Sequence, residues 1–215
     1  MAGAKRLRPQ CCLWGATQTT LYPQRFYPRL QRLLKKEDVL VIETGTCMLH
    51  LGAMLLPDGV GCESQTLWGS IGWGTPAALG VAMAQHSGRT ILVTCDGSHQ
   101  LTMNEIGVMG RYDAKPIIFV LNNGIYGIED VVSERGHAYD DIAPVQYHRL
   151  PEVMGCKAWF TRRVSTIGEL EDALATINKS QAAAYIEVMI PESESQPLPG
   201  WVIDQTYKTR TPSAA

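Results

Sequence analysis

The sequence lacks several features that would place it in well-defined classes of protein. No stretch of its 215 residues approaches the roughly 18 consecutive apolar residues of a membrane-spanning helix. Its formal net charge of −2 offers neither a basic face for nucleic acid nor an acidic tail. The basic residues Lys5, Arg6 and Arg8 are not followed by the apolar core of a secretion signal. We therefore expect a soluble, cytoplasmic protein.

Cysteine-based and common phosphate-binding motifs are missing too. The six cysteines include no C-x-x-C pair, and their spacing is typical of neither a zinc site nor a disulfide framework, so we expect reduced, mostly buried thiols. They are Cys11, Cys12, Cys47, Cys62, Cys95 and Cys156. There is no G-x-x-x-x-G-K-[ST] loop, and GSIGWG (69–74) does not match the dinucleotide-binding G-x-G-x-x-G.

What the sequence does contain is a succession of strand and helix patterns. Short apolar runs without polar alternation predict buried parallel strands at 39–43, 90–94, 116–121, 157–164 and 183–190. Apolar residues at helical spacing predict helices at 24–36, 46–56, 75–86, 101–112 and 166–179. In the third of these, Thr75 is the expected N-cap and Pro76 the first helical residue.

This alternation predicts one α/β domain with a three-layer architecture, in which helices cover both faces of a mostly parallel sheet. We expect the domain to span residues 23–191. Residues 1–22 form a lead segment, and the polar, proline-containing residues 192–215 form a tail that is expected to cover the active site.

Polar residues directly follow two of the predicted strands. Asp96-Gly97-Ser98 comes after one and Asn122-Asn123 after the next, and ligands of parallel sheets bind beyond the carboxyl ends of the strands. Carboxylate and amide oxygens suit Mg²⁺ or Ca²⁺ rather than zinc, and the N–H groups of a helix opened by Ser98 attract phosphate. Each piece alone is more typical of an ordinary turn. Together they favour a diphosphate bridged by a metal ion.

Five segments, in unbroken order, resemble the diphosphate-binding (PP) domain of the thiamine diphosphate (ThDP)-dependent pyruvate and indolepyruvate decarboxylase family. The resemblance covers about residues 23–190, and its segments are ETGT (43–46), LWGSIGWGTPAALGVAMA (67–84), DGSHQLTMNEI (96–106), VLNNGIYGIE (120–129) and YDDIAPVQYHRLPEVMG (139–155). In this family ThDP carries the chemistry, because it adds to the carbonyl of a 2-keto acid and accepts the electrons released with CO₂.

The resemblance implies a role for individual residues of the metal and diphosphate site. Asp96, the side chain of Asn123 and the backbone carbonyl of Ile125 are expected to ligate Mg²⁺. The residues expected to contact the diphosphate are Thr46, Gly97 and Ser98.

Four further residues are expected around the rings of the cofactor and the substrate. The resemblance implies that the carbonyl of Gly69 accepts a hydrogen bond from the aminopyrimidine, and that Ile71 holds the cofactor in its bent shape. It makes Glu129 the catalytic acid–base residue and places Ile128 beside it in the substrate pocket. Without the resemblance, Glu129 would be interpreted as a surface helix residue.

The sequence also departs from the family pattern at three positions. Cys95 replaces the usual glycine before the metal aspartate, Gly124 stands one place earlier than the usual glycine, and Gly127 replaces a threonine. The loop after the second asparagine must therefore bend differently.

Members of this family also carry a pyrimidine-binding (PYR) domain, which supplies the other half of each site. We therefore expect this chain to be the PP subunit of a split 2-keto acid decarboxylase, active only with a separate PYR chain in a heteromer of α₂β₂ type. One alternative is a split carboligase or acetolactate-synthase-like enzyme, against which LWGSIG and IYGIE favour a decarboxylase. Another is a non-catalytic binding or regulatory partner.

Overall fold

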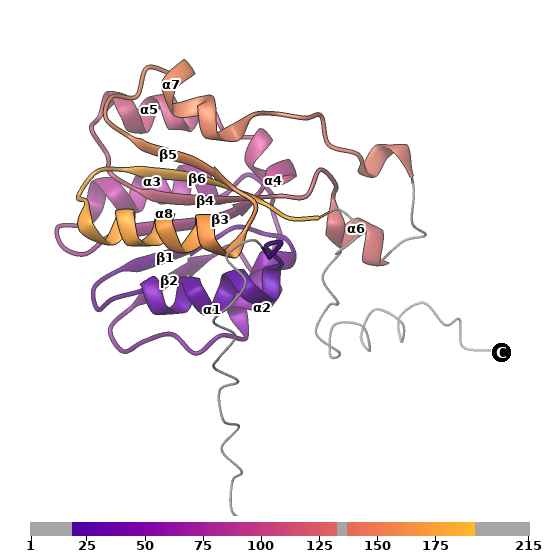
Figure 1. Cartoon of the computed structure of the whole chain (residues 1–215), viewed down its shortest axis with the longest axis horizontal. Coiled ribbons are helices and arrows are strands. Elements are labelled where there is room, and N and C mark those ends of the chain that lie inside the picture. Colours follow the sequence, from indigo (N-terminus) through magenta and orange to yellow (C-terminus); the bar gives the residue numbers. More distant parts are fainter. Residues whose placement is uncertain (1–18, 133–136, 192–215) are drawn as a thin grey trace, which may run out of the picture.

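The computed structural model describes residues 19–132 and 137–191. At its centre lies one six-stranded sheet, in which all neighbouring strands are parallel and the order is β2-β1-β3-β4-β6-β5 (Figure 1). The strands are β1 (Val39–Ile42), β2 (Gly61–Ser64), β3 (Thr90–Cys95), β4 (Ile117–Asn122), β5 (Phe160–Val164) and β6 (Ala184–Met189). The predicted parallel α/β architecture is confirmed.

Helices cover both faces of the sheet, as the three-layer prediction requires (Figure 1). On one face lie α1 (Pro23–Leu33), α2 (Thr46–Gly52) and α8 (Ile167–Lys179). On the other lie α3 (Gly74–Ala84) and α5 (Glu105–Arg111), with α7 (Leu150–Val153) next to α5. Short elements complete the chain: α4 (Asp96–Gln100), α6 (Gly127–Val132), and the 3₁₀ turns η1 (Ala138–Asp140) and η2 (Tyr147–Arg149).

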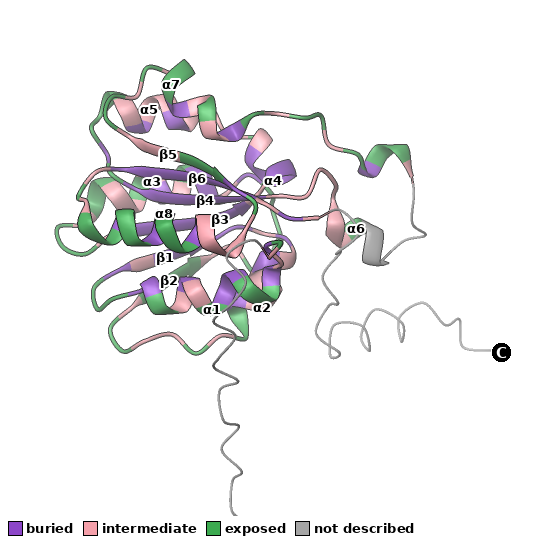
Figure 2. Cartoon of the chain, viewed as in Figure 1, coloured by how far each residue is buried: buried purple, intermediate pink, exposed green. Residues whose placement is uncertain are grey.

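The central strands are buried on both faces, which is why they read as continuous apolar runs (Figure 2). Phe119 of β4 points to the α1 and α8 side, while its neighbours Ile118 and Val120 point to the α3 and α5 side. Each such side chain contributes about 1.5–3 kcal/mol when it leaves water. The edge strand β2 is mostly exposed.

Local signals fix the ends of some elements, and tertiary contacts fix others. A capping box starts α8, where the Thr166 side chain accepts from the Glu169 N–H and the Glu169 carboxylate accepts from the Thr166 N–H. The prediction that Thr75 caps its helix is wrong, because α3 begins one residue earlier at Gly74. The N–H of Gly74, the first residue of this helix, donates instead to the carboxylate of Glu43, a contact that no local pattern could reveal.

Several boundaries differ from the sequence-based expectation. The strand β2 and the helices α6 and α7 were not predicted, α4 begins at Asp96 rather than at Ser98, and α2 ends at Gly52 rather than at residue 56. Leu21, which the predicted boundary placed in the lead segment, is fully buried in the core. The predicted tail over residues 192–215 and most of the lead segment lie outside the described residues.

Within the described ranges 19–132 and 137–191, no helix is long and apolar enough to cross a membrane.

Candidate functional site

The candidate site lies at the carboxyl ends of the strands, where the strand order changes direction. After β1 the chain moves to β2 on one side and then to β3 on the other, so a crevice opens between the ends of β1 and β3. Residues 43–46 follow β1 and Asp96 follows β3, while Asn123 follows the neighbouring strand β4. The topology therefore brings three segments, separated in sequence, to one edge of the sheet.

Three predicted metal ligands meet at this edge. With its amide nitrogen turned toward them, Asn123 donates to the carbonyl of Ile125 at 3.0 Å and to Oδ1 of Asp96 at 3.3 Å. In the opposite amide orientation, three oxygen atoms face one another at these same distances. A cation between these oxygens would stabilise that second arrangement, and hard oxygen donors are the set that Mg²⁺ prefers. The residues present therefore fit a bound Mg²⁺.

The carboxylate of Asp96 is held where its charge is costly. Its side chain is 1% exposed, and burial raises its pKa to about 6, although N–H groups of Gly124 and Gly97 hydrogen-bond to it and oppose the rise. These N–H groups donate to Oδ2 at 2.8 Å and to Oδ1 at 3.0 Å. Two hydrogen bonds do not offset the desolvation, so the site favours a positive ion beside this carboxylate.

Two glycines shape the backbone around Asp96. Gly124 adopts φ +77°, a left-handed conformation that other residues rarely tolerate, and this turn directs its N–H at Asp96. A Cβ at Gly97 would lie 2.4 Å from the ring of Tyr126, so no side chain fits there. Gly124, the displaced glycine of the NNGIYGIE segment, therefore directs a backbone N–H donor at Asp96.

The residues expected at the diphosphate surround the crevice. Thr46 opens α2, and Ser98 lies buried in α4 with its hydroxyl donating to the carbonyl of Thr44 at 3.1 Å. The Thr44 hydroxyl is itself buried and has no hydrogen-bond partner among the described residues. Gly69 adopts φ +57° beside the Thr44 methyl group. The crevice thus offers one unused hydroxyl, that of Thr44, beside the residues expected at the diphosphate.

Ile71, the predicted wedge, lies two residues beyond Gly69 and is 40% exposed. Its position depends on Glu43, a fully buried carboxylate at the end of β1. Glu43 accepts from the N–H of Thr44 at 2.9 Å and from that of Gly74 at 2.8 Å. Burial raises the pKa of Glu43, whereas hydrogen bonds from four backbone N–H groups lower it. Glu43 therefore ties the Ile71 loop and α3 to β1.

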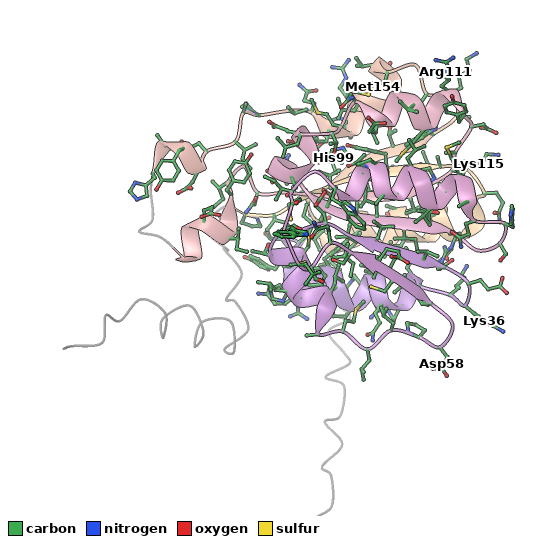
Figure 3. All side chains as sticks on the ribbon, turned by 180° about the vertical axis from the view of Figure 1, so that it is seen from behind. Lys36, Asp58, His99, Arg111, Lys115 and Met154 are labelled. Atoms are coloured by element: carbon green, nitrogen blue, oxygen red, sulfur yellow. The ribbon has the colours of Figure 1, made fainter. Side chains whose placement is uncertain are left out.

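Sequence reasoning missed Glu43 and a second buried polar group around His99. The signal for Glu43 was the acidic residue directly after a strand in ETGT. His99 lies in α4 beside the sheet (Figure 3), and its ring nitrogens bond Thr75 Oγ1 at 2.9 Å and Tyr185 Oη at 2.6 Å. Burial lowers the pKa of His99 to about 3, so the imidazole is neutral. These bonds anchor the helix that begins with Asp96.

The neighbouring asparagine has a structural task. The amide of Asn122 donates to Oε1 of the buried Glu187 at 2.8 Å, and Oε2 of Glu187 bonds the His148 ring at 2.5 Å. A cavity of about 400 Å³ adjoins this group and is lined in part by Asp96 and Met189. The consecutive asparagines therefore make different contacts: Asn122 bonds Glu187 at the end of β4, and Asn123 faces Asp96 and the Ile125 carbonyl.

The two residues predicted beside the substrate lie on α6, which stands beyond the carboxyl ends of the strands (Figure 1). Ile128 is half-buried and Glu129 is exposed. The structure thus places Glu129 on the exposed surface of a helix.

Of the four described cysteines, only Cys47 is buried, and Cys62 is exposed. The prediction of mostly buried thiols is wrong for the described part of the chain. Cys95 and Cys156 are half-buried.

Comparison with known proteins identifies the family of this chain. Residues 54–188 match the family described as thiamine pyrophosphate enzyme, C-terminal TPP-binding domain. This chain belongs to that family. The ThDP-binding architecture predicted from the sequence is thereby confirmed, and the crevice between β1 and β3 is the place where a ligand of such a sheet binds.

Relatives of this ThDP-family chain are much longer than the chain itself. It is 36% identical over 169 residues to an alpha-keto-acid decarboxylase of Mycolicibacterium paratuberculosis, covering 78% of this chain and 30% of the relative. It is 34% identical over 179 residues to one of Mycobacterium ulcerans, covering 83% and 32%. The chain therefore spans about a third of the length of these relatives.

Solved structures with the same fold include a ThDP-dependent 4-hydroxybenzoylformate decarboxylase of Rhodococcus jostii RHA1. The TM-score is 0.69 at 21% identity, over 80% of this chain and 33% of that one. A benzoylformate decarboxylase of Polynucleobacter necessarius gives a TM-score of 0.64 at 21% identity, over 76% and 32%.

Proposed function

We propose that this ThDP-family chain is the diphosphate-binding half of a non-oxidative 2-keto acid decarboxylase. The observation that carries the proposal is the meeting of Asp96, Asn123 and the Ile125 carbonyl around a position suited to Mg²⁺. Relatives named alpha-keto-acid decarboxylase support the reaction class. When bound, ThDP supplies the electron sink that the loss of CO₂ requires.

The residues of this chain would hold and orient the cofactor. Asp96, Asn123 and the Ile125 carbonyl would bind Mg²⁺, and Thr46, Gly97 and Ser98 would contact the diphosphate. Glu43 would keep Ile71 under the cofactor by fixing the start of α3.

A complete site needs more than the described residues provide. Glu129 is exposed on α6, whereas proton transfer in a decarboxylase needs a site shielded from water. Large apolar side chains are also exposed along the loop that carries Gly69: Leu67 (91%), Trp68 (84%) and Ile71 (40%). Such a surface is typical of a protein interface.

We therefore infer a heteromer with a separate PYR-domain chain, of α₂β₂ type, in which unlike chains share each site. The partner would cover Leu67 and Trp68 and enclose Glu129, through an interface above roughly 2,000 Å². Magnesium and a cytoplasmic location belong to the same proposal.

The test is to purify this chain, add a PYR-domain chain with ThDP and Mg²⁺, and measure CO₂ release. The substrates are pyruvate, indolepyruvate, phenylpyruvate and branched 2-keto acids. We expect turnover only with both chains. Turnover by this chain alone would contradict the shared site, and acyloin formation without free aldehyde would indicate a carboligase instead.

A matched pair of variants tests the metal site in the same complex. Asp96→Ala removes the charged ligand and should weaken ThDP binding by about 1.5–3 kcal/mol, the typical range for a charged contact. Asp58→Ala removes an exposed carboxylate from the loop after α2 and should leave binding unchanged (Figure 3). Equal affinities for the two variants would show that Asp96 is only a turn residue.

A further inference from the structure

Two cysteines face each other near the carboxyl ends of β1 and β3, in the core on the α1, α2 and α8 side of the sheet. Cys47 is the second residue of α2, directly after Thr46, and Cys95 ends β3, directly before Asp96. The thiol of Cys95 donates to Sγ of Cys47 at 3.6 Å, and the Cys47 thiol donates to the Glu43 carbonyl at 3.3 Å. The two hydrogen bonds run from Cys95 through Cys47 to the backbone carbonyl of Glu43, and they hold the two sulfur atoms in contact.

No other described cysteine has such a neighbour. Cys62 lies exposed on the edge strand β2, and Cys156 donates to the carbonyl of Ile106 at 3.3 Å. Within residues 19–132 and 137–191, neither makes a hydrogen bond to another sulfur. The contact between Cys47 and Cys95 is therefore specific to the cofactor end of the sheet.

A disulfide requires the two sulfurs to approach further. A disulfide bond is about 2.05 Å long, so the two Sγ atoms must close a gap of roughly 1.5 Å. Their segments start from neighbouring strands, in which Ile42 lies opposite Val93 and the Glu43 N–H donates to the Val93 carbonyl at 3.0 Å. These neighbouring strands hold the two segments side by side. Rotation of the two side chains can supply the remaining movement.

We propose that Cys47 and Cys95 form a redox modification site, in which a peroxide converts the two thiols to an intramolecular disulfide. Cys95 is half-buried and Cys47 is fully buried, so peroxide reaches Cys95 first. The Cys95 sulfur attacks the O–O bond, giving a sulfenic acid and one water. The Cys47 thiol then attacks that sulfur, and a second water leaves with its proton. Two thiols lose two electrons to one peroxide, and a dithiol reductant reverses the change.

The bond would act on the cofactor end of the domain, because it joins the segment of Thr46 to the segment of Asp96. This consequence rests on the proposed function, in which these residues hold the ThDP diphosphate and its metal ion. Binding groups must lie within about 0.5 Å of their productive positions. We expect the disulfide to weaken ThDP binding by the assembled complex about tenfold, which corresponds to roughly 1.4 kcal/mol. Dithiothreitol should restore it.

The first experiment needs no cofactor and uses the full chain. The chain is treated with hydrogen peroxide, free thiols are alkylated, and the protein is digested without reduction for peptide mass mapping. We expect a peptide pair joined through Cys47 and Cys95. The control variant Cys62→Ser should form the same link. In Cys47→Ser the link should be absent, and dimedone should trap a sulfenic acid on Cys95.

Two results would overturn the proposal: both thiols remaining open to alkylation after peroxide, or Cys95 joined to a different cysteine. If Cys47→Ser does not fold, Cys47→Ala gives the same comparison. A link that forms while the reduced complex fails to bind ThDP would refute the proposed function and leave the redox site standing. ThDP binding by the reduced complex, without any link after peroxide, would refute the redox site alone. A link that leaves ThDP affinity unchanged would refute its effect on the cofactor.

Discussion

The buried charge of Asp96 makes the stability of the metal-free chain depend on pH in a calculable way. Burial raises its pKa from 3.8 to about 6, so the folded state holds the proton more tightly than the unfolded state. The stabilisation is fully present below pH 3.8 and is lost as pH rises through 6. At about 1.4 kcal/mol per pKa unit, the whole effect is about 3 kcal/mol.

The variant Asp96→Asn isolates this contribution. Its amide does not titrate, and it can accept only one of the two N–H bonds from Gly97 and Gly124, which lowers stability by a constant amount. Glu43, with a raised pKa, and His99, with a lowered one, also titrate differently on unfolding, but both remain in the variant. The difference between the two proteins therefore reports Asp96 alone.

The assay is urea unfolding without metal, at intervals between pH 4 and pH 8. Relative to Asp96→Asn, the native chain should gain about 1.4 kcal/mol on going from pH 8 to pH 5, and about 2.4 kcal/mol at pH 4. Asp58→Asn, at an exposed carboxylate, should follow the native curve. If the curves of the native chain and Asp96→Asn stay parallel over this range, the buried-charge argument is wrong.

Three other substitutions test the catalytic assignment and the buried polar groups. Glu129→Gln should lower turnover of the assembled complex by about 10²–10⁴ with little change in ThDP affinity, and near-normal turnover would remove Glu129 from catalysis. Arg89→Met should lower the free energy of unfolding in urea by about 3–5 kcal/mol. The buried Asp38 side chain, which is 2% exposed and bonded to Arg89 at 2.5 Å, would lose its charged partner. Tyr185→Phe should cost about 1–3 kcal/mol by leaving a ring nitrogen of His99 unpaired, and a loss well below this would mean that the bond is dispensable.

The central strands and long helices could be predicted because their signals are local and periodic. The edge strand β2 was missed because its sequence, Gly-Cys-Glu-Ser, is mostly exposed and has no apolar run. A helix opened by Ser98 was expected, but the start of α4 at Asp96 was missed because Asp-Gly-Ser is typical of a turn and five residues give no period. Burial against the sheet decides its conformation, and the sequence does not display that contact.

The candidate site was predicted in part. The meeting of Asp96, Asn123 and Ile125 followed from the carboxyl-end rule and the family resemblance. The role of Glu43 did not, because its partner Gly74 lies 31 residues away in the sequence. The contact of Cys47 with Cys95 was equally hidden, since their separation of 48 residues carries no motif. Contacts between strand ends depend on the order of strands in the sheet, which periodicity does not reveal.

Two buried carboxylates at the same edge show which part of the domain depends on a ligand. The carboxylate of Glu43 is stabilised within the chain, because backbone N–H groups, among them those of Thr44 and Gly74, donate to it. Asp96 also receives two N–H bonds, yet it faces the Ile125 carbonyl and the Asn123 amide, which in one orientation adds a third oxygen. The first arrangement is complete as folded and stabilises the scaffold. The ionised carboxylate of Asp96 is fully stabilised only with a cation beside it. The fold therefore places an uncompensated negative charge at the position where the metal is proposed to bind.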